Sequence, residues 1–261
     1  MRSRLTAVIS LVLLLFSCDK IQENPLDPEG SDYTPPETFL TMEALEGAVL
    51  DTSTVTITWS GNDLVVEYAY SLNGDWSEWS SATSVTLNYL DEDAYTFSVK
   101  GRYASEMEDE TPAMVNFSVD MIQGPALRVY TLLTEMIVNS TADIHIYAED
   151  VEELVIIRFQ VQYDAGVLGP ETVTKGELLT GIEEMVFIVE EINTGLLEVN
   201  VGIPSHSGIT GTGSLVTLSF TSKAVGSTAI EIQNTEYGKL GDISGDPDPF
   251  TQTVNGMVKV E

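Results

Sequence analysis

The chain has 261 residues, of which 41 are Asp or Glu and 11 are Lys or Arg, so its formal net charge is −30 at pH 7. A surface this acidic repels nucleic acid and anionic lipid headgroups, which excludes functions that bind them through a basic patch. Hydrophobic residues make up 43% of the chain, which suffices for one or two packed cores. Cys18 is the only cysteine, so no disulfide forms within the chain and its stability must come from those cores.

Residues 1–17 have the pattern of a secretory signal peptide. Arg2 and Arg4 form a basic start, and the apolar run LTAVISLVLLLF is shorter than the roughly 20 residues of a membrane span. The run ends in LFSC, which resembles the cleavage box of bacterial lipoproteins. The resemblance implies lipidation of Cys18 and a protein anchored to a bacterial membrane, at the outer membrane or the cell surface. The alternative is an ordinary secretory signal with an incidental cysteine.

Residues 18–37 are expected to form a disordered tether. The stretch carries four prolines and has no hydrophobic period, which is typical of an extended linker. Such a tether lifts the domains that follow off the membrane surface.

Residues 38–120 have the alternating pattern of a β-sandwich of about seven strands. In TVTITW, the apolar residues Val55, Ile57 and Trp59 fall on one face of a strand. The segment LDEDAYTFSV resembles the tyrosine corner of fibronectin type III and immunoglobulin-like domains. The resemblance implies that the Tyr95 hydroxyl group donates a hydrogen bond back across the corner.

The segment SLNGDWSEWS contains a turn signal and two tryptophans. Asn73-Gly74 is typical of a two-residue turn, so we expect it at the tip of a hairpin. Trp76 and Trp79 are candidates for stacking on a sugar ring, but residues three apart on a strand face opposite ways. We therefore favour packing over sugar binding for this pair.

After the short linker MIQGP, the second β pattern is clearest in LVIIRFQVQYD. One face of this strand is apolar and suits a core: Ile157, Phe159, Val161 and Tyr163. The other face is mostly polar: Ile156, Arg158, Gln160 and Gln162. After Asp164 the chain must turn out of the sheet, and Ala165 and Gly166 allow that turn. We expect the next apolar residue, Leu168, to fold back from a loop and cover the open end of the core.

The order of several segments in this region resembles the cohesin domain. They are AEDVEEL, the strand ending in Tyr-Asp with its following leucine and GELL, INTGLLEVNVGI, SGITGTGSLVTLSFTSKAVGSTAIEI and VNGMVKV. The resemblance implies a nine-stranded jelly-roll sandwich, related in fold to some carbohydrate-binding modules. Cohesins are non-catalytic, and they bind dockerin modules, often carried by glycoside hydrolases, through one flat sheet face.

The same resemblance implies a partner-binding role for the outward residues Ile156, Arg158, Gln160 and Gln162. Well-known cohesins have polar Asn and Asp at the positions of Ile156 and Arg158, and commonly a proline at that of Ala165, so this chain departs from the family there. The alternative is that the four residues form a solvated sheet face without a partner.

Little in the sequence supports catalysis or metal binding. The two histidines and a lipidated cysteine cannot form a nucleophile triad or a metal-ligand set. In GDISGDPDP, Asp242, Ser244 and Asp246 have the spacing of a calcium loop, but Pro247 stands where that loop needs glycine. We expect no cofactor, and a weak calcium site is the alternative interpretation of this segment.

Together these patterns predict an all-β, non-catalytic lipoprotein of the cell envelope with two β-sandwiches in tandem. The first, residues 38–120, is fibronectin type III/Ig-like, and the second, residues 121–261, is cohesin-like. The expected partner is a dockerin-type module, for example on a polysaccharide-degrading enzyme. The alternatives are direct binding of a polysaccharide by the second sandwich and a structural or adhesive surface spacer. The second sandwich has no Trp and few aromatic residues, which favours a protein partner over a sugar.

Overall fold

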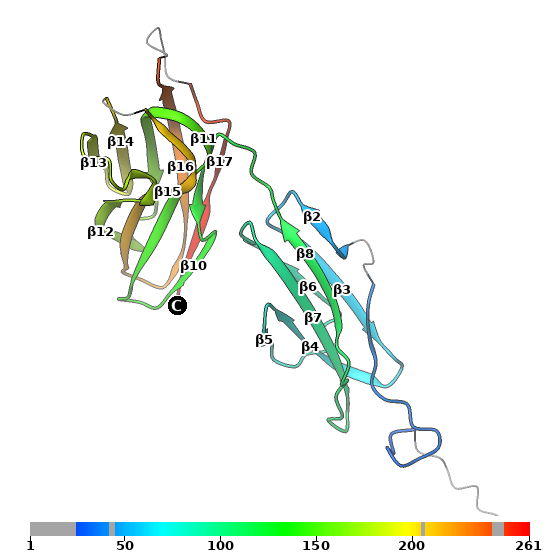
Figure 1. The fold of residues 1–261 in the computed structure, drawn as a ribbon. Coiled ribbons are helices and arrows are strands. Elements are labelled where there is room, and N and C mark those ends of the chain that lie inside the picture. Colours follow the sequence, from blue (N-terminus) through cyan, green and yellow to red (C-terminus); the bar gives the residue numbers. More distant parts are fainter. Residues whose placement is uncertain (1–24, 42–44, 205–206, 242–247) are drawn as a thin grey trace, which may run out of the picture. The chain divides into compact units, whose positions relative to one another are not determined.

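The structure is a computed structural model that describes residues 25–41, 45–204, 207–241 and 248–261. These residues are built largely of β-strands and contain no α-helix (Figure 1), which confirms the all-β class. In the described part of the chain, no helix is long and apolar enough to cross a membrane. The predicted signal peptide and Cys18 lie outside the described residues, so both remain predictions.

In the N-terminal region, residues 38–120, the described part of the chain forms eight strands in two sheets. The strands are β1 (Thr38–Leu40), β2 (Ala48–Leu50), β3 (Val55–Gly61), β4 (Val65–Leu72), β5 (Asp75–Trp76), β6 (Ser84–Leu87), β7 (Ala94–Tyr103) and β8 (Ala113–Val119). One sheet has the order β1-β3-β6 and the other β2-β8-β7-β4-β5. Val55, Ile57 and Trp59 of β3 are all buried, as their alternation predicts.

The tyrosine corner is present at the start of β7. The Tyr95 hydroxyl group donates a hydrogen bond of 2.9 Å to the backbone carbonyl of Asp91, four residues upstream. The ring stacks on Phe117 with 5.4 Å between ring centroids. Burial raises the pKa of Tyr95 to about 12, so the hydroxyl group remains a donor at neutral pH.

The predicted hairpin tip is confirmed between β4 and β5. Leu72 pairs with Asp75, which leaves Asn73 and Gly74 as the two turn residues. Both have positive φ angles, 57° and 140°, a backbone region that asparagine and glycine tolerate better than other residues.

The last residues of the predicted tether are held by side chains of the strands that follow. The Asn62 side-chain amide donates to the carbonyl of Pro35 at 2.7 Å, and the Tyr103 hydroxyl group donates to the carbonyl of Thr34 at 2.8 Å. Pro36 is buried. Residues 34–36 therefore belong to the folded region, because a proline-rich segment without a hydrophobic period can still pack through its backbone carbonyls.

The described chain divides into two compact units. One takes in residues up to 41 together with 59–83 and 98–114, and the other takes in the remainder up to 97 together with 115–261. The dividing line crosses β3, β7 and β8. The domain boundary at residue 120, which the sequence predicts, therefore stays a prediction.

The described residues of the C-terminal region, 121–261, form ten strands, where the resemblance to cohesins implies nine. They are β9 (Ala126–Tyr130), β10 (Leu133–Met136), β11 (Thr141–Gln162), β12 (Leu168–Lys175), β13 (Val186–Asn193), β14 (Leu196–Gly202), β15 (Ile209–Ser222), β16 (Gly226–Lys239), β17 (Gln252–Val254) and β18 (Gly256–Val260). A short 3₁₀ helix, η2 (Glu177–Leu179), follows β12.

These strands form two layers that share β11. In the first, which we call the β15 layer, the order is β12, β15, the first half of β11, β9 and β17. In the second, the β14 layer, the order is β13, β14, the second half of β11, β16, β18 and β10. A single continuous strand thus passes from one layer into the other (Figure 1).

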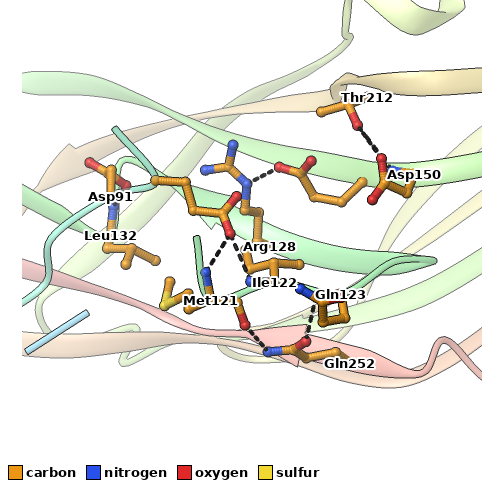
Figure 2. Close-up of polar contacts among 11 residues, drawn as sticks. Asp91, Met121, Ile122, Gln123, Arg128, Leu132, Asp150, Thr212 and Gln252 are labelled. Carbon is orange, nitrogen blue, oxygen red and sulfur yellow. Dashed lines mark hydrogen bonds and ion pairs between the residues drawn. The ribbon is translucent and has the colours of Figure 1, made fainter. Parts of the chain in front are cut away.

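The middle of β11 is irregular where it changes layers. Asp150 and Glu153 have positive φ angles of 49° and 52°. Their backbone N–H groups donate to the side-chain hydroxyl oxygens of Thr212 and Thr210, each at 3.0 Å, and Figure 2 shows Thr212 beside Asp150. The two hydroxyl groups therefore satisfy backbone donors that have no regular ladder partner.

The hydrophobic core lies between the two layers and includes both residues that the sequence singles out. Tyr163 is 3% exposed and Leu168 is fully buried. The Tyr163 ring meets Phe220 edge-on, with 4.9 Å between ring centroids. The predicted interior position of both side chains is confirmed.

Asp164 organises the turn that brings Leu168 back to the core. Its backbone carbonyl accepts the N–H groups of Val167 and Leu168 at 3.0 and 2.9 Å, and its carboxylate accepts that of Gly166 at 2.7 Å. Leu168 does not lie in a loop as expected. It begins β12 and pairs with Ser222 on β15, because the three-residue turn is tight enough for a strand to start at once.

Side chains hold the linker between the two regions by its backbone (Figure 2). One Glu92 carboxylate oxygen accepts the N–H groups of Met121 and Ile122 at 3.0 and 2.7 Å. The Gln252 side chain accepts the N–H of Gln123 at 3.1 Å and donates to the carbonyl of Met121 at 3.3 Å. Burial raises the pKa of Glu92, although the bond from Ile122 opposes this.

Candidate functional site

The four residues with a predicted partner-binding role lie together on the outward side of the second half of β11. Ile156 is 53% exposed and the Arg158 side chain is 47% exposed, whereas Gln160 and Gln162 are half-buried. The intervening residues point into the core, as the predicted register requires. The structure thus places these side chains on one surface, the outward face of the β14 layer, which we call the β14 face.

Strand pairing shows which residues surround them. Three rows cross the β14 face from β13 through β14 and β11 to β16: Val186, Gly202, Ile156, Gly238; then Ile188, Asn200, Arg158, Glu236; then Glu190, Glu198, Gln160, Gln233. The alternation of β11 alone predicts only the β11 member of each row. The alternation in VFIVEE and LLEVNVG could have identified the β13 and β14 members, but not the rows that they join.

The first row is aliphatic and flat. Val186 is 49% exposed, and Ile188 in the adjoining row is 45% exposed. Gly202 lies between Val186 and Ile156, and Gly238 lies on the far side of Ile156, so no side chain rises between the aliphatic ones. Exposed aliphatic side chains on a flat strip are typical of surfaces that a partner covers.

A polar network centred on Glu198 lies beside the aliphatic strip. One Glu198 oxygen accepts hydrogen bonds from Arg158 at 3.0 Å and Gln160 at 2.9 Å, and the other accepts one from Asn200 at 3.3 Å. The Asn234 side chain extends the network by donating to the side-chain amide oxygen of Gln160 at 2.6 Å. These bonds fix the side-chain positions, so the surface is pre-organised before any partner arrives.

The network shifts the pKa values of its two charged groups, Glu198 and Arg158. Hydrogen bonds from Gln160, Arg158 and Asn200 lower the pKa of Glu198 below its ordinary value of 4.5. The bond to Glu198 and its charge raise the pKa of Arg158. Arg158 also lies 3.9 Å from Glu236. The one arginine in the three rows is therefore shared between two of their three glutamates, and the face is acidic overall.

The outward face of the other layer, the β15 face, has a different chemistry. Short hydroxyl side chains pair across its strands: Thr141 with Thr221 at 3.2 Å, His145 with Thr217 at 3.0 Å, Asp143 with Ser219, and Thr221 with Glu171 at 2.8 Å. Among the described residues, none of the large exposed hydrophobic side chains falls on these strand rows. The β15 face therefore offers a partner no aliphatic surface.

Trp76 and Trp79 of the N-terminal region are placed differently from the prediction. The Lys100 ammonium group lies 4.8 Å from the Trp76 ring centroid and 5.3 Å from that of Trp79, and the Arg102 guanidinium lies 4.5 Å from Trp79. The rings therefore lie on one side of β7 and not on opposite faces. The prediction was wrong because β5 ends at Trp76, so the strand alternation does not extend to Trp79. Trp76 nevertheless packs against Lys100, and Trp79 against Lys100 and Arg102.

Metal-binding side chains are not clustered in the part of the chain that is described. Those residues contain no group of three or more His, Cys, Asp or Glu side chains arranged to hold an ion. Asp242, Ser244 and Asp246, the candidate calcium ligands, lie outside the described residues. The calcium alternative therefore stays untested.

No protein-family model matches the chain, and no curated protein matches it. Solved structures of cohesin domains resemble about half of it. A non-cellulosomal cohesin from the hyperthermophilic archaeon Archaeoglobus fulgidus is 21% identical with a TM-score of 0.43, over 52% of this chain and 90% of that one. The sixth cohesin of scaffoldin B from Acetivibrio cellulolyticus, in complex with a Cel5 dockerin, is 20% identical with a TM-score of 0.45, over 53% and 100%.

A third similar structure is CaCohA2 from Clostridium acetobutylicum. It is 16% identical to this chain with a TM-score of 0.44, and the match covers 52% of this chain and 96% of CaCohA2. Likeness at these identities and TM-scores carries no functional argument. The roles of individual residues therefore rest on the geometry of the β14 face.

Proposed function

We propose that this chain is a non-catalytic docking protein of a bacterial cell envelope, and that its β14 face binds a protein partner. One observation carries the proposal. The exposed aliphatic side chains Ile156, Val186 and Ile188 meet on one flat sheet face, beside a pre-formed polar network, while the described strand rows of the opposite face have none.

The chemistry of the β14 face favours a protein over a sugar. Sugar sites use exposed aromatic rings aligned on a surface, and the three rows that cross this face contain no aromatic residue. A protein partner can instead bury the aliphatic strip and place a cationic side chain near Glu236 and Glu190. Burial of an aliphatic centre inside a polar rim is the usual anatomy of a protein–protein interface.

The rest of the proposal concerns location and partner type. Lipidation of Cys18 would anchor the chain, residues after it would serve as a tether, and a fibronectin type III/Ig-like region would act as a spacer. The tyrosine corner at Tyr95 supports that type of N-terminal region. The resemblance to cohesins makes dockerin modules, such as those on polysaccharide-degrading enzymes, the first partners to test.

The experiment compares the two faces of one protein. The full chain, its Ile156→Asp variant and its Thr174→Asp variant are immobilised and offered purified dockerin modules and, separately, insoluble polysaccharides. Thr174 is exposed on β12 in the β15 layer, so it is a matched control. We expect a dockerin to be retained by the wild type and by Thr174→Asp, and lost by Ile156→Asp.

Two outcomes would contradict the proposal. Retention on a polysaccharide without any protein partner would assign the chain to carbohydrate binding. Equal loss of the dockerin in both variants would show that the β14 face has no special role. Circular dichroism of all three proteins checks that each is folded before binding is compared.

A further inference from the structure

Strand β13 forms an open edge of the β14 layer (Figure 1). It pairs with β14 on one side and ends the strand order of the sheet on the other. Within the described residues, no backbone group from another segment bonds to its outer side. An eight-residue strand therefore presents about 26 Å of outward N–H and C=O groups to solvent.

The other sheet edges of the C-terminal region carry protections that the first part of β13 lacks, since the register shift of β13 comes only after Glu191. β12 contains Pro170, a register shift just after it, and Lys175. β10 and β17 are only four and three residues long. Proline, lysine, bulges and shortness are the usual means by which edge strands avoid pairing with another chain. Of the four sheet edges that the described residues form, β12, β17, β13 and β10, only β13 offers a long unprotected stretch for another strand to pair with.

The first part of β13 is suited to a further strand. Val186 to Val189 carry no charge and no proline, and the register with β14 is regular as far as Glu191. Val186 and Ile188 are exposed on the outward face, while Phe187 and Val189 pack against the core. A strand added beside β13 would extend both the sheet and the aliphatic strip.

The charge near β13 disfavours a second copy of this chain at the edge and favours a basic partner. Glu190 and Glu191 follow the apolar part of β13, and the whole chain has a formal net charge of −30. A second copy in antiparallel pairing would bring these glutamates close to one another and would add to the overall repulsion. An extended segment with a lysine or arginine near Glu190 avoids that repulsion.

We propose that β13 binds an extended segment of a partner protein by strand addition. The segment is aliphatic at the positions beside Val186 and Ile188 and basic beside Glu190. This site consists of the backbone edge of β13 and does not rest on the side-chain docking proposed for the β14 face. Ile156, two strands away from the edge, belongs to that face alone.

The test uses a fluorescent synthetic peptide, KTVTVTK, in which the lysines and valines share one face, blocked at both ends and offered to the full chain. Its control is the same peptide with alternate backbone amides methylated, which keeps the side chains but removes the donors of one edge. We expect saturable binding of the first peptide, slower hydrogen exchange of the β13 amides on binding, and no saturable binding of the methylated one. Glu190→Lys should weaken binding by about fivefold, while Thr172→Lys on β12 should not change it.

Three results would overturn this inference: no saturable binding of KTVTVTK, equal binding of the methylated peptide, or protection of β12 amides in place of β13 amides. Ile156→Asp separates the inference from the proposed docking function. That variant should keep peptide binding while it loses the dockerin, so each proposal can fail alone.

Discussion

The β15 and β14 faces of the C-terminal region are built partly from the same strand, yet they differ in what they leave exposed. The first half of β11 supplies Thr141, Asp143 and His145 to the β15 face, and each is paired with a side chain on β15. The second half supplies Ile156, whose neighbours in its row are two glycines. On the β15 face the outward side chains pair with one another, whereas on the β14 face the Ile156 side chain has no side chain beside it in its row.

The difference teaches that strand alternation alone does not decide whether a face is functional. Both halves of β11 alternate between buried and outward residues. What distinguishes them is the side chain across the strand: a hydroxyl group of β15 satisfies its partner, while Gly202 and Gly238 leave Ile156 uncovered. Cross-strand neighbours therefore determine whether an outward face is ready for a partner.

The largest expected effect comes from the interior that both faces share. Leu168→Ala removes a fully buried side chain and should lower the free energy of unfolding by about 2–5 kcal/mol, measured by urea denaturation. Because the core lies between the two layers, the loss of stability should speed the hydrogen exchange of β14 and β15 amides equally. A loss confined to one layer would mean that the two faces do not rest on one core.

The next effect should distinguish the faces directly. Gly202→Arg places a long cation in the middle of the aliphatic strip, and a Cβ atom at Gly202 would meet only Val186, at an ordinary 3.6 Å. The fold should therefore persist while binding of a retained dockerin falls about a hundredfold or more. Thr174→Arg makes the same addition to the β15 layer and should leave binding unchanged in a titration. If Gly202→Arg and Thr174→Arg weakened dockerin binding equally, the two faces would not differ in their role.

The smallest effect concerns the network around Glu198. Its folded-state pKa lies below 4.5, so the network is complete above pH 4.5 and is lost as the pH falls through the lowered pKa. Binding of the wild type should weaken over that acid range. Glu198→Gln cannot titrate, so its binding should be about fivefold weaker at neutral pH and should lack this part of the pH dependence. Parallel pH curves for the two proteins would show that Glu198 does not organise the face.

Local patterns predicted the features that depend on near neighbours in the chain. The period of two in LVIIRFQVQYD determined which β11 residues are buried, Asn73-Gly74 determined a turn, and LDEDAYTFSV indicated the corner at Tyr95. Each of these depends on a few consecutive residues, whose backbone preferences and alternation can be read directly.

Features that depend on distant segments could not be predicted in this way. Trp76 and Trp79 share a side because β5 ends at Trp76, and the residues that they contact there, Lys100 and Arg102, come from a distant strand. The β14 face needed residues of β13 and β14 to be aligned with Ile156, and such register is set by the whole sheet. The position of β13 at an unprotected edge is likewise a property of sheet order, which no local pattern encodes.

The passage of β11 through both layers also has a mechanical consequence. The two layers cannot peel apart without breaking or unravelling one continuous backbone of 22 residues. A load applied to the β14 layer is therefore carried by covalent bonds into the β15 layer, where β9 leads back toward the N-terminal region. A partner bound to one layer would therefore transmit force to both layers. Under tension, the C-terminal region should unfold in a single event.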